Sequence, residues 1–169
     1  MTDHTKDLAK RFFMLLYLFI TRRYRHVEIV FIRHTHEASE VDEKTFFYAT
    51  ESGGTIVSTA LTGMRKVIDQ RYPASDWNIC AAQASDGDNT SGDNDVAAGL
   101  LERSILPLCQ YFAYLEVADE AGFMGDGESE LWRAYRQCEQ RTGGPAMRKV
   151  RSRAEIFPVF HELFARQRA

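Results

Sequence analysis

Trp-Asn-Ile-Cys-Ala-Ala-Gln-Ala-Ser-Asp-Gly-Asp-Asn occupies residues 77–89, and this stretch decides the fold. Trp77 to Ala84 is a short run of mostly apolar and small residues, the pattern of a strand that is buried on both faces. The run passes directly into Ser85-Asp86-Gly87, where a glycine permits a sharp exit. Because strands buried on both faces occur in parallel sheets covered by helices, the stretch predicts an α/β protein.

The rest of the sequence alternates short strand-like runs with longer segments of helical periodicity. This rhythm predicts a doubly wound, mostly parallel sheet with helices on both faces. The segment 43–49 fits either a strand or a helical turn. The predicted strands are Val27–Ile32, Ala38–Asp42, Trp77–Ala84, Tyr111–Val117 and Ala146–Val150, and the predicted helices are Asp3–Tyr24, Thr55–Arg71, Val96–Leu108, Glu128–Arg141 and a last helix that Ser152 caps.

The composition limits the partners that the chain can bind. Apolar residues make up 44% and charged residues 27%, which is typical of one globular domain over residues 1–169. The formal charge of -3 leaves no basic excess for nucleic acid or for an anionic membrane. The longest apolar run, Phe12–Ile20, is too short to cross a bilayer, and no signal-peptide cleavage site follows it. We therefore expect a cytoplasmic protein that binds neither nucleic acid nor a membrane.

Two segments place oxygen ligands where a ligand site is expected. Ligands of such sheets bind beyond the carboxyl ends of the strands. Gly53-Gly54-Thr55 delivers a hydroxyl to the start of a helix, and Asp86 follows the strand Trp77–Ala84. Hydroxyl and carboxylate oxygens suit Mg²⁺ or Mn²⁺, so Thr55 and Asp86 are candidate metal ligands. The alternative is that Thr55 only caps the helix and Asp86 only forms a turn.

The combination of these two segments resembles two metal-binding loops of the von Willebrand factor A fold. In addition, several longer strings are similar to the bacterial YeaH/YhbH family. The resemblance covers nearly the whole chain and matches the C-terminal part of that family. The strings are Lys6-Asp7-Leu8-Ala9-Lys10-Arg11-Phe12, Phe31-Ile32-Arg33-His34, Glu40-Val41-Asp42, Gly53-Gly54-Thr55-Ile56-Val57-Ser58, Trp77-Asn78-Ile79, Ala81-Ala82-Gln83-Ala84-Ser85-Asp86-Gly87-Asp88-Asn89 and Ile156-Phe157-Pro158-Val159-Phe160.

The resemblance implies a site that this chain holds only in part. Thr55 carries over as a direct metal ligand, and Asp86 as a ligand acting through water. The first metal loop, Asp-x-Ser-x-Ser, has no counterpart, so Mg²⁺ or Mn²⁺ binding should be weak or absent. The chain is then an N-terminally truncated domain without the central first strand, which belongs between Val27–Ile32 and Trp77–Ala84. Those two strands should pair directly, or the chain should self-associate through the exposed sheet edge.

Three further residues are candidates for contact with a partner. Asp88 lies in the acidic turn after Asp86, and His34 and His36 follow a predicted strand. A histidine pair with this spacing can bind a transition metal or a partner's carboxylate, whereas a solvated turn is the simpler interpretation.

The family resemblance implies a metal-ion-dependent protein-binding module and not an enzyme. A partner's Asp or Glu would complete the coordination of the ion. A PrkA-type serine protein kinase system is the implied partner, and a bacterial regulatory or stress-related process is the implied role. The alternatives are a scaffold subunit with a vestigial metal site and a metal-assisted phosphohydrolase that uses Asp86 and Asp88. No phosphate-binding lysine motif and no nucleophile with a base supports the enzyme.

Overall fold

The computed structural model describes residues 1–34, 37–49, 56–119, 128–142 and 144–165. Two residues of the predicted site, Thr55 and His36, lie outside these ranges. The helices are α1 (Asp3–Arg23), α2 (Glu43–Tyr48), α3 (Val57–Arg71), α4 (Asp93–Leu100), α5 (Glu130–Thr142) and α6 (Arg153–Ala165), and the strands are β1 (Phe31–His34), β2 (Ala38–Val41), β3 (Ile79–Ser85), β4 (Cys109–Val117) and β5 (Ala146–Val150).

Three of the strands form a parallel sheet in the order β3-β4-β5. The other two, β1 and β2, form a separate antiparallel hairpin. The prediction of an α/β protein with a parallel sheet is therefore confirmed. The pairing of β1 and β2 is antiparallel because only three residues separate them in sequence, too few for a parallel crossover.

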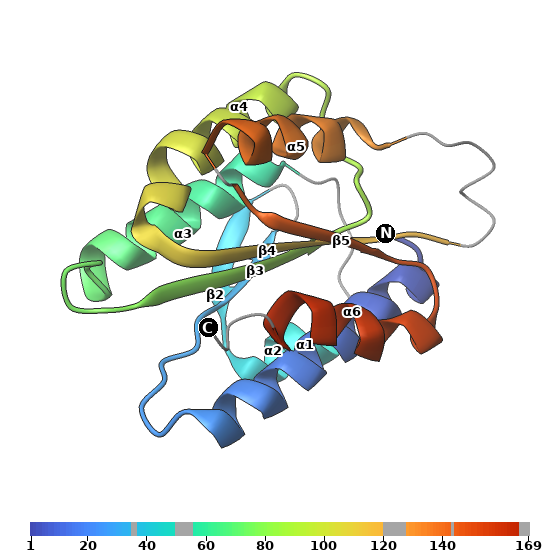
Figure 1. Ribbon diagram of the computed structural model, residues 1–169, viewed down its shortest axis with the longest axis horizontal. Helices are drawn as coiled ribbons and strands as arrows, with labels where there is room; N and C mark the ends of the chain where they lie inside the picture. Colours follow the sequence, from blue (N-terminus) through green and yellow to red (C-terminus); the bar gives the residue numbers. More distant parts are fainter. Residues whose placement is uncertain (35–36, 50–55, 120–127, 143, 166–169) are drawn as a thin grey trace.

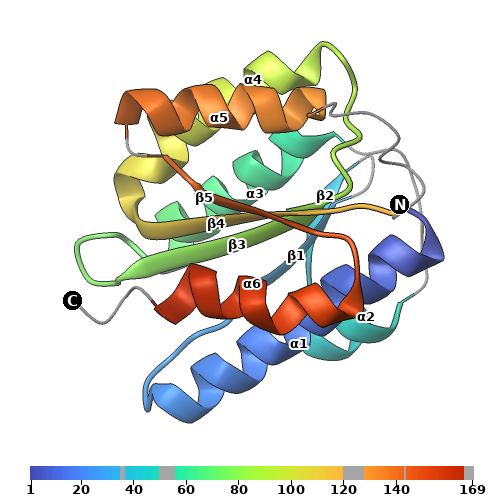
Figure 2. The same ribbon diagram turned by 45° about the vertical axis from the view of Figure 1, so that its right-hand side comes forward.

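Helices cover both faces of the parallel sheet (Figures 1 and 2). Alternate residues of β4 point to opposite faces and are buried on each. On one face, Ala113 and Leu115 pack against α1 and α6, for example against Phe12. On the other face, Phe112 and Tyr114 pack against side chains from α3, α4 and α5. The central strand thus has the two-sided burial that a parallel sheet requires.

The β1-β2 hairpin lies between the same two helical layers. On one side, Phe31 of β1 stacks against Phe46 and Phe47 of α2 and against Tyr17 of α1. On the other side, the α3 backbone at Gly63 lies close to Ala38 of β2, since a Cβ placed there would be 3.6 Å from the Ala38 Cβ. The hairpin and the parallel sheet are therefore neighbours in one sandwich.

Among the described residues, β1 and β3 do not pair with each other. The prediction that these two strands close up directly is therefore wrong. A physical reason is that α1 and α3 each contact both the hairpin and the parallel sheet or its helices, so packing holds the two sheets apart. One edge of β3 consequently has no strand partner within the described part of the chain.

Most element boundaries lie within a few residues of the predictions, and local hydrogen bonds explain several of them. Thr2 caps α1, because its Oγ1 accepts a hydrogen bond from the Thr5 backbone at 3.3 Å. The hairpin pairing begins at Phe31, four residues after the predicted start of the strand. The ambiguous segment 43–49 is helical, since Asp42 caps it by accepting from the Thr45 backbone. Helix α4 begins at Asp93, and a π-helical turn (Leu101–Ile105) and a 3-10 turn (Leu106–Leu108) follow its end at Leu100.

None of the helices in the described ranges combines the length and the hydrophobicity that crossing a bilayer requires.

The unpaired edge of β3 makes a testable prediction about backbone protection. Amides of residues 79–85 that point away from β4 should exchange with solvent about tenfold or more faster than those of β4, which has strand partners on both sides. Hydrogen exchange read by NMR, at a concentration where the chain is monomeric, measures this. Equal protection in β3 and β4 would contradict the unpaired edge, and protection that rises with protein concentration would indicate self-association through it.

Candidate functional site

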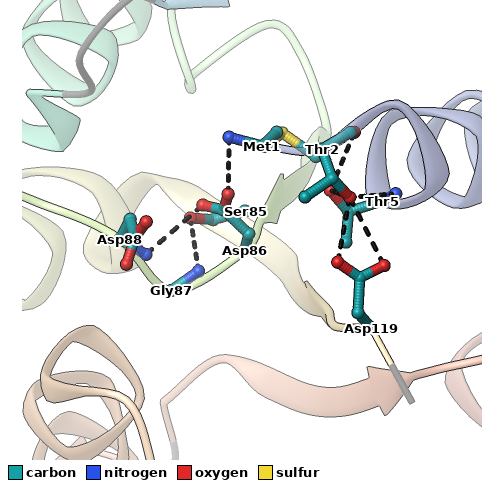
Figure 3. A network of polar contacts seen from close by, with 8 residues as sticks. All are labelled: Met1, Thr2, Thr5, Ser85, Asp86, Gly87, Asp88 and Asp119. Carbon is teal, nitrogen blue, oxygen red and sulfur yellow. Dashed lines mark hydrogen bonds and ion pairs between the residues drawn. The ribbon is translucent and has the colours of Figure 1, made fainter. Parts of the chain in front are cut away.

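The turn that follows β3 is built around Gly87. Gly87 has a φ of 84°, a conformation that L side chains rarely adopt. Its backbone N–H donates to Ser85 Oγ at 3.1 Å, and the Asp88 N–H donates to Asp86 Oδ1 at 3.3 Å (Figure 3). These two short-range bonds fix the direction in which the Asp86 carboxylate leaves the sheet.

The Asp86 carboxylate forms an ion pair with the amino group of Met1. The ammonium group of Met1 lies 2.8 Å from Asp86 Oδ2, and the Asp86 side chain is 15% exposed. The neighbouring Thr2 donates to the Asp119 carboxylate beyond the end of β4, at 3.1 Å (Figure 3). The beginning of α1 is therefore attached to the carboxyl ends of both β3 and β4, the edge where ligands of parallel sheets bind.

His34 ends β1 and lies within electrostatic reach of the Asp86 carboxylate. Burial lowers the pKa of His34 below its ordinary value, and the Asp86 carboxylate opposes this shift electrostatically. The His34 Nδ1 atom is buried and has no hydrogen-bond partner. Asp88 is exposed at the turn, which suits contact with a partner.

The start of α3 is bound to the loop that follows Asp86. The Val57 N–H donates to Asn89 Oδ1 at 3.2 Å, and the Ser58 N–H donates to Asp93 Oδ2 at 3.0 Å. These side chains satisfy backbone donors that a helix N-terminus leaves without partners. The helix that follows the Gly53-Gly54-Thr55 segment therefore begins beside the Asp86 loop, although Thr55 itself lies outside the described residues.

A buried charged pair lies beneath the turn and was missed in the sequence. Glu116, 3% exposed, lies one residue before the end of β4 and forms an ion pair with Lys149 of β5, with Oε1 3.1 Å from Nζ. Its other oxygen accepts from Ser129 Oγ, and Ser129 caps α5 by accepting from the Trp132 backbone. One signal was available, because a Glu inside an otherwise apolar strand must find a partner.

Within the described ranges, no group of three or more His, Cys, Asp or Glu side chains comes together as a metal site. The oxygens of Asp86 are of the kind that Mg²⁺ and Mn²⁺ prefer.

Comparison with known proteins identifies the family. A family model described as "Protein of unknown function (DUF444)" matches residues 1–167. The chain belongs to this family. UPF0229 proteins of Mesorhizobium japonicum and Bradyrhizobium diazoefficiens are 57% and 56% identical to it over 99% of its length. The UPF0229 protein of Shewanella oneidensis is 50% identical over the same share. The YeaH/YhbH family predicted from the sequence is the same group.

The relatives are considerably longer than this member of the DUF444 family. The chain spans 39% of the Mesorhizobium and Bradyrhizobium proteins and 38% of the Shewanella protein. No solved structure matches the chain significantly. The family assignment therefore rests on sequence, and the activity of the whole protein is a matter for proposal.

The conformation of Gly87 predicts a strong effect of a small substitution. In Gly87→Ala, the new Cβ would lie 2.5 Å from the Ser129 Cβ, and the positive φ adds strain. We expect the free energy of unfolding to fall by at least about 2 kcal/mol, measured by chemical denaturation. Gly92→Ala is the matched control, because no atom lies within 4 Å of its Cβ. Equal losses in the two variants would contradict the structure of the turn.

The buried His34 predicts a pH dependence of stability. Its pKa in the folded chain is below the ordinary 6.5, so near and below that pH the unfolded chain binds more protons. Stability should therefore fall as the pH is lowered from about 7.5 to about 5.5. His34→Gln should reduce this fall. Subtracting the variant's curve of unfolding free energy against pH from the wild-type curve removes the contribution of the other histidines. Parallel curves would show that His34 titrates alike in both states.

Proposed function

We propose that this chain is a metal-ion-dependent protein-binding module. In this proposal a Mg²⁺ or Mn²⁺ ion lies at the Asp86 turn, Asp86 holds it through water and Thr55 binds it directly. A partner's Asp or Glu supplies a further ligand, with His34, His36 and Asp88 at the rim of the contact. The chemistry is a charge bridge, because a divalent cation joins two groups that would otherwise repel each other.

One observation carries the proposal. The carboxylate of Asp86 stands at the carboxyl edge of a parallel sheet, in a turn that Gly87 shapes, and its side chain remains 15% exposed. The location and charge of this carboxylate therefore suit a cation. The attachment of α3 to the same loop, through Asn89 and Asp93, supports the convergence of the two candidate metal-binding segments.

We further infer that the domain is of the von Willebrand factor A type, with a central strand missing between β1 and β3. In support, the hairpin and the parallel sheet lie between the same helical layers, yet the two strands do not pair within the described chain. The greater length of the relatives leaves room for such a strand elsewhere in the whole protein. Self-association through the β3 edge is the alternative way to cover it.

A scaffold subunit with a vestigial metal site is the second candidate function. It is favoured by the small donor set around Asp86, since no cluster of three or more ligating side chains forms among the described residues. Catalysis forms no part of the proposal. A cytoplasmic location and a regulatory role beside a PrkA-type kinase complete the proposal, and the partner would be recognised by an exposed carboxylate.

Titration calorimetry with Mg²⁺ and Mn²⁺ tests the proposed site. We expect a dissociation constant in about the millimolar range, because few protein oxygens replace the ion's tightly held water. Asp86→Ala should abolish the binding, and Asp76→Ala, which removes an exposed carboxylate before the opposite end of β3, should leave it unchanged. A micromolar constant that survives Asp86→Ala would refute the assignment.

The same variants separate the three functions in a binding assay. Capture of a candidate kinase should require Mg²⁺ and fail with chelator or with Asp86→Ala if the metal bridges the partner. Capture that ignores chelator and Asp86→Ala would favour the scaffold. Metal-dependent hydrolysis of phosphate esters that Asp86→Ala abolishes would favour the phosphohydrolase.

A further inference from the structure

Three polar side chains after the Asp86 turn join three helices. Asn89 Nδ2 donates to Asp93 Oδ2 at 3.0 Å and to Asn94 Oδ1 at 2.9 Å. Asn94 in turn donates to Glu130 Oε2, in the first turn of α5, at 3.1 Å. We define Asn89, Asp93 and Asn94 as the polar joint.

Two members of the polar joint are buried and the third, Asn89, is half-buried. Asp93 is 9% and Asn94 6% exposed. Burial alone would raise the pKa of Asp93, but the hydrogen bonds from Ser58 and Asn89 outweigh it and lower the pKa below its ordinary value. The side chain is therefore a carboxylate at the N-terminus of α3, where a negative charge interacts favourably with the helix dipole.

The polar joint connects the Asp86 turn to the start of α3. On one side, Asn89 lies three residues after Asp86, in the same loop. On the other side, Asn89 and Asp93 hold Val57 and Ser58, which begin α3 two residues after Thr55. The bonds span 32 and 35 positions of sequence, so they fix segments that the chain itself leaves independent.

We propose that Asn89 and Asp93 are positioning residues that set the Asp86 turn relative to the start of α3. This inference rests on the proposed function for its consequence, since the two segments would supply the ligands of one ion. Neither residue needs to touch the ion. Asn94 extends the same constraint to α5, so a displacement of the turn would be resisted by three helix ends together.

Asp93→Ala tests the polar joint, with Asp93→Asn as the conservative variant and Asp95→Ala as the matched control. Asp95 lies in the same first turn of α4 but is exposed. In Asp93→Ala, amide exchange should rise about tenfold both at residues 57–58 and at residues 86–89, as for loss of a helix cap. Asp93→Asn keeps an acceptor oxygen and should restore most of the protection. Asp95→Ala should resemble the wild type.

Broadening of NMR signals by Mn²⁺ provides a readout that a purely structural role would not move. In Asp93→Ala, the Mn²⁺ concentration needed to broaden the signals of residues 86–89 should rise about tenfold, the same factor as for the lost helix cap. The amide-exchange protection of β4 should stay unchanged. If the wild type shows no broadening but the coupled exchange is present, the proposed function fails and the polar joint stands.

Two results would overturn the polar joint. One is faster exchange confined to residues 57–58, with residues 86–89 unchanged. The other is normal exchange and normal Mn²⁺ broadening in Asp93→Ala. If Asp93→Ala does not fold, Asn89→Ala decides the matter, because it removes the bond to Val57 and leaves the bond from Ser58 to Asp93 in place. Coupled exchange in Asn89→Ala would support the inference, and unchanged exchange at residues 86–89 would overturn it.

Discussion

The two-sided burial of β4 is the constraint on which the rest of the structure depends. Its residues 112–117 are buried, alternately beneath α1 and α6 on one face and beneath α3, α4 and α5 on the other. A strand in this position cannot carry an unpaired polar side chain without a large loss of stability. The charged residue of this stretch, Glu116, lies near the end of the strand. There its carboxylate forms an ion pair with Lys149 and accepts a hydrogen bond from Ser129.

The same constraint gathers the polar chemistry at one edge. Glu116 stands beside Ser85 in the strand register, so the turn at Gly87 packs directly against the Glu116 and Ser129 side chains. Asp86 then leaves the sheet one residue after Ser85, beside this polar group. A binding site at this edge is a consequence of the layered fold, and its identity depends on the side chains of the turn.

The hairpin shows how helical layers can hold two sheets together without a shared strand. Aromatic side chains of α1 and α2 cover one side of β1, and α3 covers the other side of the hairpin. Packing of this kind is non-directional, whereas strand pairing requires aligned donors and acceptors. The helices can therefore fix the positions of the two sheets while an edge of β3 remains without a strand partner in the described chain.

Local pattern in the sequence determined the alternation of strands and helices, the place of β3 and the turn at Gly87. These features depend on residues that are neighbours in the chain, such as a glycine that alone tolerates a φ of 84°. The prediction that β3 is buried on both faces is wrong, because β3 is an edge strand of the described sheet and only Ser85 of its residues is fully buried. Only the tertiary structure decided which loops meet. The bonds from α3 to Asn89 and Asp93 join positions more than 30 residues apart, and the separation of β1 from β3 results from packing against α1 and α3. Periodicity records which face of an element is buried, but it does not record the element that covers that face.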